Sequence, residues 1–135
     1  LLLADPSQEI IKSYLRQGDC YVAQLGQEVI GVYVLLATGP KTVDLVNIAI
    51  AEDRQGMGFG KQLVEHAIGE TKAGGYARLE VGTGNSSIDQ LAFYQKCGFR
   101  IYAIEPDYFT RHYPEPIHEN GIWCRDMVRL YLEIS

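Results

Sequence analysis

The segment from Gln55 to Lys61 carries three glycines at alternate positions, Gly56, Gly58 and Gly60, between an apolar run and a helical pattern. Glycine lets the backbone approach a ligand closely and adopt conformations with positive φ. The free N–H groups of a helix's first turn, with the charge of Lys61 nearby, form a site for an anion. The spacing therefore predicts a turn that binds a pyrophosphate. The alternative is a tight strand-to-helix turn without a ligand.

Two common phosphate-binding motifs do not fit this turn. The dinucleotide-binding fingerprint requires G-x-G-x-x-G, whereas the turn reads G-x-G-x-G. The P-loop requires Ser or Thr after its Lys, and here Gln62 follows Lys61. The turn therefore differs from the usual binding sites for NAD and ATP.

Two acidic residues, Asp44 and Glu80, lie inside otherwise apolar strand patterns. An unpaired carboxylate would be costly in such a position. Carboxylates placed in this way are candidates for a general base. The alternative is that each side chain faces solvent at a strand end, or pairs with Arg78 or Lys41.

The histidines and cysteines predict neither a metal site nor a covalent mechanism. His112, His118 and Cys124 have a spacing that fits no common zinc site. No His stands beside Cys20, Cys97 or Cys124, so a covalent route through a cysteine is not favoured. The odd number of cysteines predicts reduced thiols, and hence a cytoplasmic protein.

The elements that position these residues follow from the periodicity of apolar side chains. The predicted strands are Cys20–Leu25, Glu28–Thr38, Val43–Ile50, Tyr76–Gly82, Arg100–Ile104 and Met127–Ile134. The first two form a hairpin through a tight turn at Gly26 and Gln27. Val43–Ile50 is apolar on both faces and is expected to be a central strand.

Three helices are expected between these strands. The first begins at Asp5 and ends at Gly18, and the second follows the glycine turn and stops at Gly74-Gly75. The third opens with a capping box from Ser87 to Gln90. The segment Glu105–Gly121, rich in Pro, His and Tyr, is predicted to be a long loop that selects the substrate.

Together the pattern predicts an α+β fold with a central mixed, mostly antiparallel sheet flanked by helices. A single domain over residues 1–135 suits the chain length. The chain opens on Leu1-Leu2-Leu3 as if inside a strand, so we expect the N-terminal strand to be truncated. The net charge of −5 without a basic run argues against nucleic acid or an anionic membrane as a partner.

The pattern Gln55-x-x-Gly58-x-Gly60 resembles the Q/R-x-x-G-x-G/A signature of the GCN5-related N-acetyltransferase (GNAT) superfamily. The resemblance extends over nearly the whole chain and is closest to a bacterial subgroup that is mostly uncharacterised. It implies acetyl-coenzyme A as co-substrate and no metal. It also implies that the cofactor is bound by Ile48, Ala49, Ile50, Gln55, Gly56, Met57, Gly58, Phe59, Gly60 and Lys61.

The same resemblance assigns roles to Asn85 and Tyr94. Asn85 would bind the pantetheine or the acetyl group, and Tyr94, which precedes Gly98-Phe99, would protonate the departing coenzyme A thiolate, as general acid catalysis requires. Asn85 and Tyr94 are further apart than in the usual pattern, so that Ser87 stands where a gapless alignment from Tyr94 would place the Asn. The alternatives are a turn residue at Asn85 and a partly buried aromatic at Tyr94.

Asp44 and Glu80 occupy the positions of carboxylates that serve as general base in different members of the superfamily, and some members use ordered water instead. The resemblance implies direct acetyl transfer to a primary amine, which we expect to belong to a small molecule. Three alternatives remain: a peptide or protein N-acetyltransferase, a non-catalytic acyl-coenzyme A-binding module, and a nucleotide-binding protein. Superfamily members are often dimers, which allows a homodimer.

Overall fold

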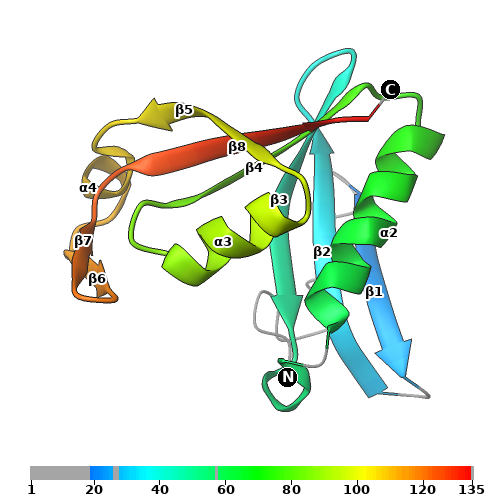
Figure 1. Cartoon of the computed structure of the whole chain (residues 1–135), viewed down its shortest axis with the longest axis horizontal. Coiled ribbons are helices and arrows are strands. Elements are labelled where there is room, and N and C mark those ends of the chain that lie inside the picture. The colour runs from blue at the N-terminus through cyan, green and yellow to red at the C-terminus, as the bar shows by residue number, and fades with distance from the viewer. Residues whose placement is uncertain (1–18, 26–27, 57, 135) are drawn as a thin grey trace. The chain divides into compact units, whose positions relative to one another are not determined.

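The computed structural model describes residues 19–25, 28–56 and 58–134 (Figure 1). The predicted helix between Asp5 and Gly18, the turn at Gly26 and Gln27, and Met57 lie outside the described residues. The chain divides into two compact units. Of the described residues, those up to Leu79, together with residues 133 and 134, form the first unit, and residues 80–132 form the second.

In the first unit, three antiparallel strands follow one another as neighbours. They are β1 (Asp19–Leu25), β2 (Glu28–Ala37) and β3 (Thr42–Ile50). In β2, every residue from Val29 to Leu35 is buried, so both of its faces are covered. The three strands predicted from the sequence are confirmed, with ends that differ by one residue.

A helix covers these strands. The short 3-10 helix η1 (Glu52–Arg54) leads into α2 (Phe59–Ala73), which packs on β2 and β3 (Figure 1). The buried side of α2 is formed by Leu63, Val64, Ala67 and Thr71, which follow helical spacing. A Cβ atom on Gly31 of β2 would lie 2.8 Å from Leu63 Cδ1, so glycine is what lets the helix approach this strand. The helix ends at Gly74, and Gly75 has a φ of +82°, as predicted.

The second unit contains most of the remaining elements. They are β4 (Arg78–Gly84, which begins in the first unit), α3 (Ile88–Lys96), β5 (Arg100–Glu105), α4 (Tyr108–His112), β6 (Ile117–Glu119), β7 (Ile122–Cys124) and β8 (Met127–Glu133). Strand β8 pairs antiparallel with β5. The buried apolar residues of the second unit include Val81, Phe99, Val128 and Leu130. The predicted fold class, α+β with a mixed, mostly antiparallel sheet and flanking helices, is confirmed.

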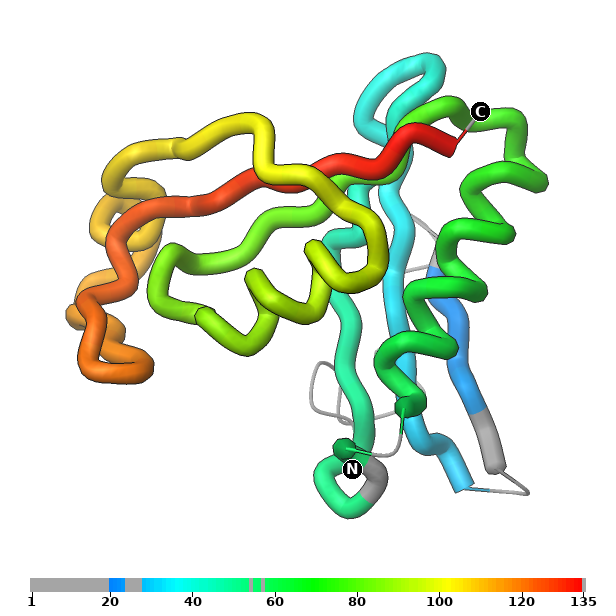
Figure 2. The backbone as a smooth tube through the Cα atoms, in the orientation of Figure 1, coloured from blue at the N-terminus to red at the C-terminus, as the bar shows by residue number. Residues whose placement is uncertain are grey.

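The prediction of a long loop over Glu105–Gly121 was wrong. Figure 2 shows the chain leaving β5, turning through residues 106–126 and returning as β8, and we call this part the α4–hairpin segment. It contains α4 and an antiparallel hairpin of β6 and β7. Asn120 and Gly121 both have positive φ, 56° and 72°, as a tight hairpin turn requires. This Asn-Gly pair is the sequence signal for the hairpin.

No helix in the part of the chain that the structure describes is long and apolar enough to cross a membrane.

Candidate functional site

The glycine turn has the backbone geometry that its sequence predicts. Gly56 and Gly58 have φ values of +79° and +83°, which side-chain-bearing residues rarely adopt. A Cβ atom at either position would meet nothing within 4 Å. The glycines are therefore required by backbone conformation and not by lack of space.

Gly58 is the N-cap of α2 and has no side chain that could accept a hydrogen bond from the first helical turn. The first helical bond closes from the N–H of Gln62 to the carbonyl of Gly58, at 3.2 Å. The N–H groups of the three preceding residues, Phe59, Gly60 and Lys61, have no carbonyl within the helix to bind. The helix also has no acidic residue in its first turn. This end of α2 therefore suits an anion.

Strand β3 is irregular just before the turn. Its pairing with β2 shifts by one residue between Leu45 and Asn47, which leaves Val46 as a bulge that is 47% exposed. Bulges bend a strand and are frequent beside functional sites. The next three residues, Ile48 to Ile50, pair regularly with β2.

The end of β3 and the glycine turn are joined by a side chain. Gln55 Nε2 donates a hydrogen bond to the carbonyl oxygen of Ile50 at 3.2 Å. Gln55, the first residue of the signature, thus holds the turn against the strand. Ile50 and Phe59 also line one cavity of about 390 Å³, together with Gly31, Leu63 and other residues of the first unit.

The two candidate general bases have different surroundings. Asp44 is half-buried in β3, opposite Leu36 of β2. Glu80 Oε1 accepts hydrogen bonds from the Tyr102 hydroxyl at 2.9 Å and from Arg129 Nη2 at 3.3 Å. The Glu80 and Arg129 side chains are only 16% and 18% exposed. The ion pair favours the charged carboxylate.

The sequence did not predict Arg129 as the partner of Glu80. The sequence offers Arg78 and Lys41 as partners, but Arg78 Nη1 lies 3.7 Å from Oε1 of Glu133. Arg129 is on β8, far from Glu80 in the sequence, so only the pairing of strands brings the two together.

Tyr94 is buried on α3, with 3% of its surface exposed, and its ring contacts Phe93 and Phe99. Within the described part of the chain, its hydroxyl has no hydrogen-bond partner. Burial, and to a smaller extent the neighbouring Cys97, raises the pKa of Tyr94 to about 12. The phenol is therefore protonated at neutral pH and is a weaker acid than an ordinary tyrosine.

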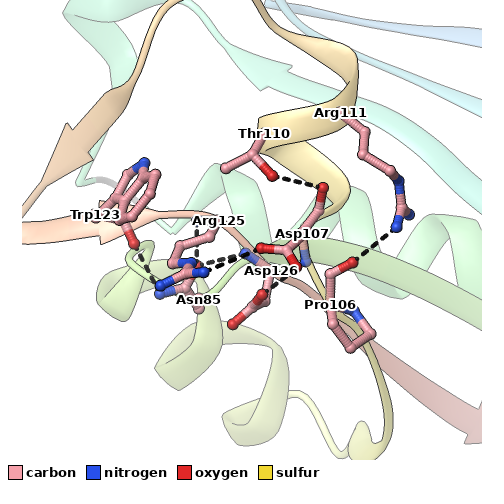
Figure 3. Close-up of polar contacts among 8 residues, drawn as sticks. All are labelled: Asn85, Pro106, Asp107, Thr110, Arg111, Trp123, Arg125 and Asp126. Atoms are coloured by element: carbon pink, nitrogen blue, oxygen red, sulfur yellow. Dashed lines mark hydrogen bonds and ion pairs between the residues drawn. The ribbon is translucent and has the colours of Figure 1, made fainter.

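Asn85 lies in the turn after β4 and contacts the α4–hairpin segment (Figure 3). Its side-chain oxygen accepts hydrogen bonds from the backbone N–H groups of Arg125 and Asp126, both at 2.9 Å. Its side-chain nitrogen donates to the carbonyl of Trp123 at 3.1 Å, and its backbone N–H donates to the carbonyl of Asp126 at 3.0 Å. One amide hydrogen of the side chain is left for any other contact.

The predicted capping box at the start of α3 was wrong. Ser87 is the N-cap, but its hydroxyl makes no capping bond and donates instead to Glu119 Oε1 at 2.7 Å. Gln90 Oε1 accepts a hydrogen bond from the Thr83 hydroxyl at 2.7 Å. Both side chains of the expected box are thus engaged with partners outside the helix.

The structure distributes the predicted site residues over both units. The first unit holds Asp44, Ile48, Ala49, Ile50, Gln55, Gly56, Gly58, Phe59, Gly60 and Lys61, and the second holds Glu80, Asn85 and Tyr94. Met57 is outside the described residues. Among those described, no three His, Cys, Asp or Glu side chains are grouped so that they could hold a metal ion.

The family model of the acetyltransferase (GNAT) family matches residues 3–99, and the chain belongs to this family. It is 62% identical, over 134 residues, to YvbK, an uncharacterised N-acetyltransferase of Bacillus subtilis, covering 99% of this chain and 86% of YvbK. The predicted class, an acetyltransferase enzyme of the GNAT superfamily, is therefore confirmed.

Solved structures of similar proteins agree with this family assignment. A Bacillus subtilis acetyltransferase in complex with coenzyme A matches with a TM-score of 0.90 and 61% identity, over 98% of this chain and 88% of that one. A GNAT acetyltransferase of Elizabethkingia anophelis with acetyl-coenzyme A bound matches with a TM-score of 0.87 and 49% identity, over 97% and 86%. The predicted co-substrate, acetyl-coenzyme A, is bound in the second of these structures, and the first contains coenzyme A.

Proposed function

We propose that this enzyme transfers an acetyl group from acetyl-coenzyme A directly to a primary amine of a small molecule. The observation that carries the proposal is the buried Tyr94 hydroxyl, which keeps its proton and has no partner among the described residues. In the reaction, the amine nitrogen attacks the thioester carbonyl carbon and the carbon–sulfur bond breaks. Tyr94 gives its proton to the departing thiolate, and the amine loses a proton to a base.

For the cofactor, we propose that the first unit supplies the binding groups. The backbone N–H groups from Gly56 to Lys61 would bind the pyrophosphate, and the backbone of Ile48 to Ile50 would pair with the pantetheine. The positive-φ glycines, the open first turn of α2 and the Gln55–Ile50 hydrogen bond support this assignment. Met57 belongs to the same proposed turn.

Binding of acetyl-coenzyme A is the first measurement that tests the proposal. At concentrations 100 to 1,000 times Kd, a true ligand is expected to stabilise the protein by roughly 3–4 kcal/mol, seen as a higher Tm. We expect this shift with acetyl-coenzyme A and coenzyme A, and none with NAD or ATP at the same concentrations. A shift with NAD or ATP alone would identify a nucleotide-binding protein and contradict the proposal.

The acceptor can then be found by a thiol-release screen over small amines, polyamines, aminoglycosides and N-terminal peptides. A cavity of about 120 Å³ in the α4–hairpin segment, lined by Phe109, Tyr113, Trp123 and other residues, is smaller than the roughly 300–1,000 Å³ of usual ligand pockets, so it could hold only a small group of an acceptor. Release only with peptides would favour the alternative, a peptide or protein N-acetyltransferase. Binding of the cofactor without release for any acceptor would favour a non-catalytic module.

For the base, we propose Glu80 first and Asp44 second. Glu80→Gln keeps the size of the side chain and its ability to accept a hydrogen bond from Tyr102, but removes the carboxylate that would take the proton. We expect kcat to fall by about 10²-fold or more, with unchanged affinity for acetyl-coenzyme A. Asp44→Asn is the matched control, and its rate should stay near that of the parent.

The kcat values of these two variants distinguish Glu80 from Asp44 as the base. A loss of kcat only in Asp44→Asn would make Asp44 the base. Full activity in both variants would contradict a protein base and leave ordered water in that role.

We also propose a cytoplasmic enzyme that forms a homodimer. No disulfide joins Cys20, Cys97 and Cys124, which suits a reducing compartment.

For the homodimer, the support is an apolar surface on β5. Ile101 and Ile104 are 47% and 51% exposed there, and a second copy could cover them. Light scattering on the purified protein measures the oligomeric state, and a monomer at all concentrations would contradict the dimer.

A further inference from the structure

The turn between β4 and α3, residues 84–87, contacts the α4–hairpin segment at two places. At the first, Asn85 makes four hydrogen bonds to Trp123, Arg125 and Asp126 (Figure 3). At the second, the hydroxyls of Ser86 and Ser87 donate to Glu119 at 3.3 and 2.7 Å. Most polar side chains of this short turn are thus used to hold the segment.

Close packing accompanies these hydrogen bonds. A Cβ atom on Gly84 would lie 2.5 Å from the sulfur of Cys124, the last residue of β7. Asn120, in the turn of the hairpin, donates through its side chain to the carbonyl of Ser86 at 2.8 Å. The hairpin therefore rests directly on the turn.

Arg125 and Asp126, the residues whose N–H groups Asn85 binds, also hold the start of α4. The Asp126 carboxylate accepts a hydrogen bond from the N–H of Asp107 at 2.9 Å, and the Arg125 carbonyl accepts one from the N–H of Phe109 at 2.9 Å. Arg125 Nη2 also lies 3.2 Å from Asp107 Oδ1. A change at Asn85 would thus be transmitted through Arg125 and Asp126 to α4.

The chemistry of the Asn85 side chain fits this role closely. Two backbone N–H groups need an acceptor and one backbone carbonyl needs a donor, and only a side-chain amide offers both at this length. Asp could satisfy the two N–H groups but would place an oxygen against the Trp123 carbonyl. Ala would satisfy none of the three.

We propose that Asn85 is a positioning residue, which fixes the α4–hairpin segment for acceptor binding, and that it is not a ligand of coenzyme A. The inference rests on the proposed function, in which this segment selects the acceptor. It revises the role that the superfamily resemblance implied for Asn85. Asn85 acts through Arg125 and Asp126 and takes no part in the bond changes of the transfer.

The test compares Asn85→Asp and Asn85→Ala with the parent enzyme by three measurements. Hydrogen exchange at the N–H groups of Arg125 and Asp126 is expected to rise in Asn85→Ala and to rise less in Asn85→Asp. The KM for the amine found in the screen is expected to rise in the same order, by roughly tenfold to a hundredfold in Asn85→Ala. The Kd of acetyl-coenzyme A, measured by calorimetry, is expected to change by less than twofold.

Gln95→Ala serves as the control, because Gln95 is exposed on α3 and its side chain donates a hydrogen bond to the carbonyl of Leu91 within the same helix. All three measurements should match the parent. A rise in the Kd of acetyl-coenzyme A in either Asn85 variant, or unchanged exchange in Asn85→Ala, would overturn the proposal. If the parent enzyme itself binds no acetyl-coenzyme A, the proposed function fails, and the exchange measurement still decides whether Asn85 holds the segment.

Discussion

Replacing Tyr94 by Phe is expected to remove most of the turnover while leaving the free protein at least as stable as the parent. General acid catalysis contributes about 10²–10⁴-fold, so kcat should fall by about 10²-fold or more. The Tyr94 hydroxyl is buried without a partner among the described residues, and an unsatisfied buried hydroxyl costs about 1–3 kcal/mol. Phe fills the same space without that group, so Tm should stay the same or rise. Thiol-release kinetics and thermal unfolding measure both effects.

The same substitution changes the response of stability to alkaline pH. Tyr94 has a pKa of about 12 in the folded protein, against 10.0 for an ordinary tyrosine. Between these values, the unfolded chain loses its proton while the folded protein keeps it, so stability falls as pH rises from 10 towards 12. The loss grows to about 3 kcal/mol above pH 12, of which about 1 kcal/mol is already present at pH 11, and it should be absent in Tyr94→Phe. Denaturant unfolding at pH 9 and pH 11 measures it.

Tyr76→Phe is the control for both Tyr94 experiments, since Tyr76 lies outside the proposed catalytic groups. Its kcat and its stability at alkaline pH should follow the parent. A Tyr94→Phe enzyme with the parent's kcat would remove Tyr94 from its proposed role. Equal loss of stability at alkaline pH in both variants would show that Tyr94 is not the group that titrates.

Replacing Gly58 by Ala is expected to weaken acetyl-coenzyme A binding by more than tenfold. Gly58 has a φ of +83° at the N-cap of α2, where a side chain adds about 1–2 kcal/mol of strain. The chain would relieve this strain by moving the first-turn N–H groups that we propose to bind the pyrophosphate. Tm should fall as well, and calorimetry with acetyl-coenzyme A gives the affinity.

Gly69→Ala is the matched control, because Gly69 lies in the interior of the same helix and a Cβ atom there would meet nothing within 4 Å. Ala is favoured over Gly inside a helix, so stability should rise by about 0.5–1 kcal/mol. The affinity for acetyl-coenzyme A should not change. Unchanged affinity in Gly58→Ala as well would contradict the role of the turn in cofactor binding.

The parts of the fold that the sequence predicted are those determined by local patterns. Strands β1 to β3, the end of α2 at Gly74-Gly75 and the positive-φ glycines of the turn follow from side-chain periodicity and from glycine itself. The capping box failed because Ser87 finds a partner in Glu119, which is distant in the sequence. A capping rule that uses only neighbouring residues cannot take account of a hydrogen-bond partner so distant in the sequence.

The site shows the same division between local and distant effects. The turn at Gly56 and Gly58 could be predicted from residue types alone. The ion pair of Glu80 with Arg129 depends on strand pairing, and the raised pKa of Tyr94 depends on the depth of its burial. Neither effect can be obtained from spacing along the chain. The resemblance implies that Asn85 binds the cofactor, whereas its partners in the α4–hairpin segment are distant in the sequence and follow only from the fold.

The hydrogen bonds that hold the α4–hairpin segment all close within residues 80–132, whereas the glycine turn is built from residues 55–61. The two sets of contacts share no residue. If, as we propose, the turn binds the acetyl donor and the α4–hairpin segment selects the acceptor, a lineage could gain a new acceptor by changing the hairpin while inheriting its acetyl donor unchanged.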